Sequence, residues 1–168
     1  MNFKESIQKL NDLIESKAKS LKNTDFNFDK VAFLKALAMC ESSFSRNNVP
    51  RFEPLYFKDG FYYRKSPLVR DLVEKFDRDA ACSYSSFQIL FVTAFEFGFK
   101  GNPSELKDDS IALPIVITFI NKRIIRFKPN RIEDMFDAYN SGNFKDNIIP
   151  EAYINKAMTW YNYYLNKG

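Results

Sequence analysis

The stretch ALAMCESSF, residues 36–44, predicts the end of a buried helix that carries an acidic side chain on its apolar face. Apolar residues recur at helical spacing before Glu41, which falls on the same stripe one turn later. A carboxylate in such a position is costly unless it has a partner or a task. Apolar neighbours and the negative end of the helix dipole both favour its protonated form. Two interpretations stay open: a general acid, as a glycosidase requires, or a buried glutamate paired with Arg51 or Arg70.

Length and composition predict one folded domain. The chain has 168 residues, of which 45% are hydrophobic and 27% are charged, and this excludes a disordered protein. We therefore expect a single domain over residues 1–168, with residues 1–22 as an N-terminal packing helix. No segment resembles a signal peptide or a membrane span, so we expect synthesis in a cytoplasm and no integral membrane segment. We expect a monomer.

The charged and metal-binding residues narrow the classes of partner. The net charge is +4, and the basic residues are scattered without a run of four or more. This pattern disfavours a nucleic-acid partner and suits an anionic polymer such as a bacterial cell wall. The chain contains no histidine, and its two cysteines, Cys40 and Cys82, are too few for a four-thiolate zinc site. We expect neither a metal nor an organic cofactor.

Hydrophobic periodicity predicts an α+β protein that is mainly α. The helical period is lost at about 45–65, where extended segments flank the turn at 58–60, and a small β-hairpin or a pair of extended loops is expected there. Asn27 or Asp29 can cap the helix that carries Glu41, and Ser110 can cap a central buried helix. The predicted helices span residues 3–22, 29–43, 67–76, 87–97, 111–127, 131–139 and 150–166, with a single helical turn at 103–106.

Four short stretches then occur in a defined order: ESSF at 41–44, SYSSFQI at 83–89, AYNSG at 138–142 and YINK at 153–156. Together they resemble the soluble lytic transglycosylases of glycoside hydrolase family 23, whose relatives include the goose-type lysozymes. The family patterns read roughly E-S-x-F/W-N, A-S-x-G-L-M-Q-I, A-Y-N-A-G and Y-V-x-K/R. The resemblance covers most of the chain from about 30 to 165, and it implies a lysozyme-like fold.

The resemblance implies a role for each matching residue. Glu41 matches the catalytic acid/base, and Gln88 matches a glutamine that faces the sugar. Phe87 stands where the family has methionine, and Ser85-Ser86 replaces Gly-Leu, which leaves the shape of this subsite open. Tyr139 and Asn140 match the Tyr-Asn pair that lines the cleft, with the tyrosine hydroxyl near the catalytic carboxyl. The alternative for Phe87 is a core residue, and the alternative for Tyr139-Asn140 is a helix C-cap. The residues expected to bind substrate are Ser42, Glu53, Tyr56, Tyr84, Ser86, Phe87, Gln88, Tyr139 and Asn140.

The implied substrate is the MurNAc-β-1,4-GlcNAc bond of peptidoglycan. In the implied reaction Glu41 protonates the glycosidic oxygen, and the N-acetyl oxygen of the sugar stabilises the oxocarbenium-like centre. Glu41 then accepts the proton of the C6 hydroxyl as it attacks, which gives a 1,6-anhydro end. Most glycosidases use two carboxylates, and Glu53 is the nearest second candidate, although Arg51 and Arg64 can both pair with it.

Two alternative functions stay open, and so do the roles of three tyrosines and two cysteines. A hydrolytic muramidase would use Glu41 together with Glu53, and a non-catalytic cell-wall-binding or structural virion protein would keep only the fold. The small size and the missing signal suggest a phage endolysin or a virion-associated lysin. Tyr56, Tyr62 and Tyr63 fit either sugar stacking or plain packing. Cys40 and Cys82 fit either two reduced thiols or a disulfide formed after release.

Overall fold

The computed structural model describes residues 3–46, 48–142 and 150–167, which form helices and one small sheet. The α-helices are α1 (Phe3–Lys17), α2 (Lys30–Ser42), α3 (Phe61–Lys65), α4 (Pro67–Phe76), α5 (Phe91–Glu96), α6 (Asp109–Phe119), α7 (Ile132–Ser141) and α8 (Glu151–Leu165). The strands are β1 (Arg51–Phe52), β2 (Cys82–Tyr84) and β3 (Ile89–Leu90). Shorter helical segments are η1 (Ala18–Ser20), η2 (Pro54–Tyr56), η3 (Asp77–Ala81), η4 (Pro103–Lys107), η5 (Ile120–Ile124) and η6 (Ile125–Phe127).

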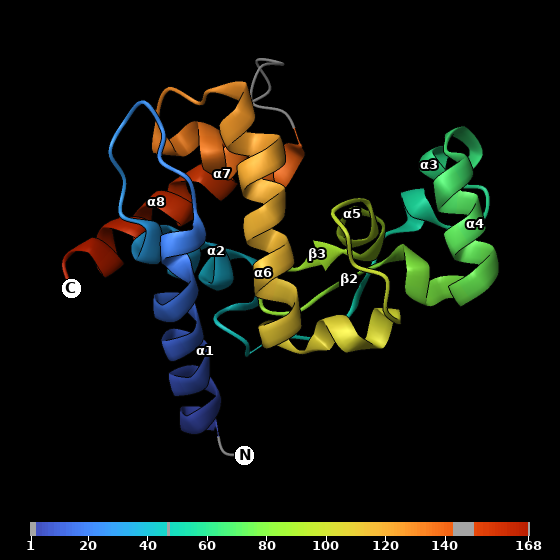
Figure 1. The fold of residues 1–168 in the computed structure, drawn as a ribbon, viewed down its shortest axis with the longest axis horizontal. Helices are drawn as coiled ribbons and strands as arrows, with labels where there is room; N and C mark the ends of the chain where they lie inside the picture. The colour runs from blue at the N-terminus through green and yellow to red at the C-terminus, as the bar shows by residue number, and fades with distance from the viewer. Residues whose placement is uncertain (1–2, 47, 143–149, 168) are drawn as a thin grey trace.

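Helix α6 runs through the middle of the molecule (Figure 1). Helices α1, α2, α7 and α8 lie on one side of it, and the sheet lies on the other side with α3, α4 and α5. The prediction of a mainly helical protein with a small β region is thus confirmed. Within the described ranges, no helix combines the length and the apolar character that crossing a bilayer requires.

Helix α2 forms the buried centre of the helical side, as its sequence predicts. The Asp29 side chain caps its N-terminus by accepting the Ala32 backbone N–H at 2.7 Å, so one of the two predicted caps is confirmed. Phe33, Leu34 and Leu37 are fully buried. The helix ends one residue after Glu41, at Ser42, and Ser43 takes a left-handed conformation with φ of 53°. The catalytic candidate therefore lies in the last turn of the most buried helix.

The sheet is antiparallel with the order β1-β2-β3, and its register pairs Arg51 with Ser83 and Ser83 with Leu90. The predicted hairpin at 45–65 is wrong in its second arm, because residues 61–65 form helix α3. Strand β1 pairs with β2 instead of with its own neighbour in sequence. The Arg70 guanidinium donates to the Arg64 carbonyl oxygen at 3.1 Å, which joins the end of α3 to α4 and favours the helical conformation.

The predicted helix at 87–97 is also wrong at its beginning, since α5 starts only at Phe91. Residues 82–90 form the β2–β3 hairpin, and both ends of its turn, Ser85 and Gln88, have positive φ. The Asp109 carboxylate accepts the Ser86 backbone N–H at 2.8 Å and the Ser86 hydroxyl at 2.6 Å. A bond from a residue distant in sequence therefore stabilises the turn against the local helical preference.

The long apolar segment predicted over 111–127 is confirmed as one helical run, α6 continued by η5 and η6. Its N-cap is Asp108, which accepts the Ser110 backbone N–H at 2.8 Å, instead of the predicted Ser110. The run widens into a π-helical turn at η5, which shifts the direction in which the following side chains point. Pro114 lies in the second turn without ending the helix.

The remaining helices follow their sequence patterns. Ser66 caps α4, and Gly142 ends α7 in the left-handed conformation with φ of 81°. Helix α8 packs extensively along α2. The elements predicted at 67–76, 103–106, 131–139 and 150–166 are confirmed within two residues at each end. The helix predicted at 3–22 is shorter, because α1 ends at Lys17 and only the short segment η1 continues to Ser20.

Candidate active site

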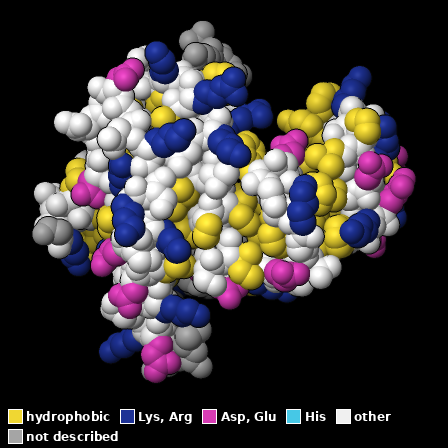
Figure 2. All heavy atoms as spheres, in the orientation of Figure 1, with side chains coloured by type: hydrophobic (Ala, Val, Ile, Leu, Met, Phe, Trp, Pro, Cys, Tyr) yellow, Lys and Arg dark blue, Asp and Glu magenta, His cyan; other side chains and the backbone are white. Residues whose placement is uncertain are grey.

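A groove with a volume of about 540 Å³ separates the helical side of the molecule from the side that carries the sheet. Figure 2 shows the corresponding hollow in the outline between the part built on α6 and the part built on α3 and α4. Its lining comes from segments far apart in the sequence and is rich in polar and aromatic side chains. Among them are Glu41, Arg51, Glu53, Tyr56, Tyr62, Ser83, Gln88, Arg123, Tyr139 and Asn140.

Glu41 enters the groove from the last turn of α2 and is held there by helix α8. The Tyr153 hydroxyl donates to Glu41 Oε1 at 2.6 Å. One turn along α8, the Lys156 ammonium donates to the backbone carbonyl of Cys40 at 2.9 Å. These two contacts fix both the side chain and the backbone of the same helical turn, so the carboxyl has one defined position in the groove.

The surroundings of Glu41 favour a carboxyl that keeps its proton. Burial raises its pKa above the ordinary value, and this is the largest effect. The Tyr153 hydrogen bond and the positive charges of Arg51 and Lys156 oppose it, because they stabilise the ionised form. Since burial outweighs them, Glu41 is suited to donate a proton.

The alternative of a buried ion pair does not hold for Glu41. Arg51 pairs with Glu53 instead, with 2.7 Å between Nε and Oε1. Arg70 donates to the backbone carbonyl oxygens of Tyr63 and Arg64. Among the residues that the structure describes, no cation lies within 4.0 Å of the Glu41 carboxylate.

Gln88 reaches the groove from the end of the β2–β3 turn and is engaged at both ends of its amide. Its Oε1 accepts the Ser83 hydroxyl at 3.1 Å, and its Nε2 donates to the Ser85 carbonyl oxygen at 3.0 Å. Tyr139 in α7 donates its hydroxyl to the Phe87 carbonyl oxygen at 2.8 Å. Burial and the charge of Glu41 raise the pKa of Tyr139 well above its ordinary value. The tyrosine therefore stays protonated and ties the turn to α7.

The opposite wall of the groove carries a stacked tyrosine pair. The ring centroids of Tyr56 and Tyr62 lie 4.4 Å apart, and the angle between the two ring planes is 20°. Both rings line the groove, whereas the third tyrosine of the segment, Tyr63, packs against the core. Burial raises the pKa of Tyr56 to about 12, so its hydroxyl is a neutral hydrogen-bonding group at neutral pH.

The structure brings together six of the ten predicted site residues and places four elsewhere. Ser42, Tyr84, Ser86 and Phe87 are buried and do not line the groove. The Ser42 hydroxyl donates to the Ala38 carbonyl oxygen and accepts the Ser45 N–H, which shapes the chain after Glu41. Phe87 is a core residue, which is the alternative to a role in substrate binding. Glu41, Glu53, Tyr56, Gln88, Tyr139 and Asn140 line the groove together.

Sequence reasoning missed the closest polar partner of the candidate acid. Tyr153, whose hydroxyl binds Glu41, is the first residue of the fourth motif stretch, YINK. The sequence therefore contains a signal for this residue but does not indicate its role. Ser83 and Arg123 also line the groove. Arg123 belongs to a helix that the pattern identifies only as buried, and the direction in which its side chain points depends on the π-helical turn.

Neither cysteine takes part in a disulfide, so the bonded alternative for Cys40 and Cys82 does not apply to this structure. Burial raises the pKa of the Cys40 thiol to about 11, which keeps it protonated and unreactive at neutral pH. Within the described ranges, no cluster of three or more acidic or cysteine side chains is arranged to hold a metal ion.

Comparison of the chain with protein-family models, with curated proteins and with solved structures finds no match.

Proposed function

We propose that the chain is a lytic transglycosylase with a lysozyme-like fold that cleaves the MurNAc-β-1,4-GlcNAc bond of peptidoglycan. The observation that carries this proposal is the convergence of Glu41, Gln88 and the Tyr139-Asn140 pair on one groove. These residues come from three of the four stretches that resemble the family. The fourth stretch supplies Tyr153, which is bonded to Glu41.

The geometry of the groove suits a sugar polymer. The groove has a volume of about 540 Å³, and a stacked pair of tyrosine rings forms part of one wall. Aromatic rings pack against the apolar faces of pyranoses, and the polar lining offers hydrogen bonds to hydroxyl and N-acetyl groups. Among the described residues of the lining, Arg51 is paired with Glu53, which leaves Arg123 to meet a carboxylate of the substrate.

In the proposed reaction Glu41 donates its proton to the glycosidic oxygen as the C1–O4 bond breaks. The N-acetyl oxygen of the substrate stabilises the positive charge that develops at C1. The C6 hydroxyl then attacks C1, and the Glu41 carboxylate accepts its proton. The acid is regenerated, no water is consumed, and the product is a 1,6-anhydro end. The raised pKa of Glu41 favours the first step.

A hydrolytic muramidase is the second candidate, because Glu53 lines the same groove. Its Oε1 is paired with Arg51 Nε at 2.7 Å, and the Ser83 hydroxyl oxygen lies 3.4 Å from it. These contacts hold Glu53 as a fixed counter-charge, which is a weaker arrangement for activating water. The substrate-assisted route therefore suits the site better than a mechanism with two carboxylates.

Mass spectrometry of digested peptidoglycan tests the proposal. Anhydro ends, which are one water lighter than reducing ends, are expected from the wild-type protein and not from Glu41→Gln. Reducing ends that disappear in Glu53→Gln would establish the hydrolase. Binding of peptidoglycan with no release of muropeptides by the wild-type protein would refute both enzymes and favour a wall-binding or structural virion protein.

A further inference from the structure

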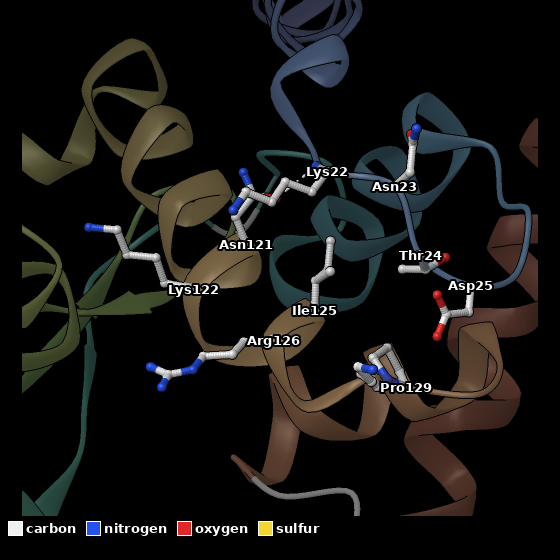
Figure 3. A pocket seen from close by; sticks show the side chains of 10 residues that line it. Lys22, Asn23, Thr24, Asp25, Asn121, Lys122, Ile125, Arg126 and Pro129 are labelled. Carbon is white, nitrogen blue, oxygen red and sulfur yellow. Dashed lines mark hydrogen bonds between the residues drawn. The ribbon is translucent and has the colours of Figure 1, made fainter.

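A second hollow, with a volume of about 470 Å³, lies where the loop after α1 meets the end of the helical run that follows α6. Figure 3 shows the two chain segments that line it, 22–25 and 121–129. They are joined through Asn121, whose side chain accepts the Lys22 backbone N–H at 2.8 Å and donates to the Ser20 carbonyl oxygen at 2.9 Å. The hollow is therefore held together by specific bonds between distant parts of the chain.

Cations dominate the side chains around this hollow. Lys22, Lys122, Arg126 and Lys128 line it, against the single carboxylate of Asp25. All four cations are exposed, and within the described ranges none of them lies within 4.0 Å of a carboxylate. In Figure 3 the side chains of Lys122 and Arg126 extend away from Asp25. The positive charge of the hollow is thus directed to solvent and is not neutralised by the protein.

The same helical segment also supplies Arg123 to the groove that contains Glu41. We call Lys22, Lys122, Arg123, Arg126 and Lys128 the basic surface. Figure 2 shows Lys and Arg side chains gathered over the upper part of α6 and the segment after it. The basic surface and Asp25 together carry a net charge of +4, which equals the net charge of the whole chain. Cations that are up to about a hundred residues apart in the sequence are thus brought together on one surface.

Stabilisation of the helix end does not account for this concentration. A helix C-terminus carries about half a negative charge, which one cation of the last turn neutralises. The basic surface holds several more. A surface of unpaired positive charge raises the local concentration of anionic ligands, and lysine ammonium groups suit a flexible polyanion because they impose little geometry.

We propose that the basic surface binds the phosphodiester groups of a polyol-phosphate polymer attached to the cell wall. The inference rests on the proposed function, because such a polymer is carried by the same wall whose glycan would enter the groove. A nucleic acid fits less well. Among the described residues that line the hollow none is aromatic, and the exposed ring of Phe127 lies outside this lining. The side-chain oxygens of Asn23 and Asn121 already accept bonds from Lys30 and Lys22, and the Asn121 amide nitrogen donates to Ser20.

Sedimentation with purified cell walls tests the inference. The protein carries Glu41→Gln so that it does not digest the walls, and it is mixed with walls that bear poly(glycerol phosphate) or with the same walls after hydrofluoric acid has removed this polymer. We expect binding to the intact walls to be at least about tenfold tighter. Adding Lys122→Glu and Arg126→Glu should abolish the difference, because each reversal replaces an attraction by a repulsion. The matched control reverses Lys4 and Lys107, two exposed lysines outside the basic surface.

Equal binding to intact and stripped walls overturns the inference, and so does equal binding by the Lys122/Arg126 variant and the control. Tighter binding to duplex DNA or to vesicles containing phosphatidylglycerol than to free poly(glycerol phosphate) also overturns it, and would identify a different anionic partner. Thermal unfolding verifies that each variant is folded. Release of muropeptides from stripped peptidoglycan by the protein with Glu41 intact reports on the proposed function separately. It should be the same with and without the reversal of Lys122 and Arg126.

Discussion

Replacing Tyr153 by phenylalanine should make Glu41 a weaker acid. The substitution removes the hydroxyl that donates to Glu41 Oε1 at 2.6 Å and leaves the ring in place. A hydrogen bond to a charged group contributes about 1.5–3 kcal/mol, and one between neutral groups about 0.5–1.5 kcal/mol. The ionised carboxylate therefore loses about 1–1.5 kcal/mol more than the protonated acid. This difference lowers the acid dissociation constant of Glu41 about tenfold.

The direction of the effect follows from the role of the bond. The Tyr153 hydrogen bond lowers the pKa of Glu41 and partly offsets the burial that raises it, so its removal raises the pKa further. Carbon-13 NMR titration of the side-chain carboxyl measures this change without any assumption about catalysis. In a peptidoglycan-release assay, the high-pH limb of the rate profile, which reports the loss of the proton from the acid, should move to higher pH.

Tyr161→Phe is the matched control, because it removes a hydroxyl from the same helix. The Tyr161 hydroxyl accepts the Asp29 backbone N–H at 2.9 Å and does not touch Glu41. It should reduce stability and leave the Glu41 titration unchanged. An unchanged titration in Tyr153→Phe, or an equal change in both variants, would refute the assignment of Tyr153 as the residue that positions and tunes the acid.

Three further changes have defined outcomes. Burial raises the pKa of Glu41 above 4.5, so the contribution of Glu41 to folding stability falls as pH rises above that value. Glu41→Gln should therefore increase the free energy of unfolding at pH 7 by about 1.4 kcal/mol for each unit by which the pKa of Glu41 is raised. Urea denaturation should show that the gain vanishes at acid pH. Tyr139→Phe leaves the buried Phe87 carbonyl oxygen without its donor and should cost about 1–3 kcal/mol in thermal unfolding, whereas Tyr63→Phe should cost little. Gly142→Ala meets no neighbour within 4 Å but adopts a φ of +81°, so a loss of about 1 kcal/mol is expected in the same assay.

Local patterns predict most of the longer helices, because the apolar period and the end residues of such a helix are encoded in its own segment. Asp29, Ser66 and Gly142 sit at the ends of helices that the structure confirms. The helix with Glu41 on its apolar stripe could be predicted for the same reason. Burial of that stripe is also what raises the pKa of Glu41, so the chemistry of the acid follows from the same pattern.

The larger errors in the sheet region lie where contacts between distant residues decide the conformation. The segment SSFQI has a helical preference, yet Asp109 and Tyr139 bind its turn from other helices and hold it in a hairpin. Strand β1 is two residues long, and its partner lies about thirty residues later, so no local signal identifies the pairing. The bond from Tyr153 to Glu41 and the clustering of Lys22 with Lys122 are of the same kind.

The bond between Tyr153 and Glu41 joins residues that are 112 positions apart. Closing a loop of this size has an entropic cost that is recovered only when α8 has docked along α2. Until then the glutamate belongs to a solvated chain and titrates like any other carboxyl. The acidity of the groove is thus a property that the protein has only once α8 is docked on α2, and a partly unfolded chain carries the right residue without its reactivity.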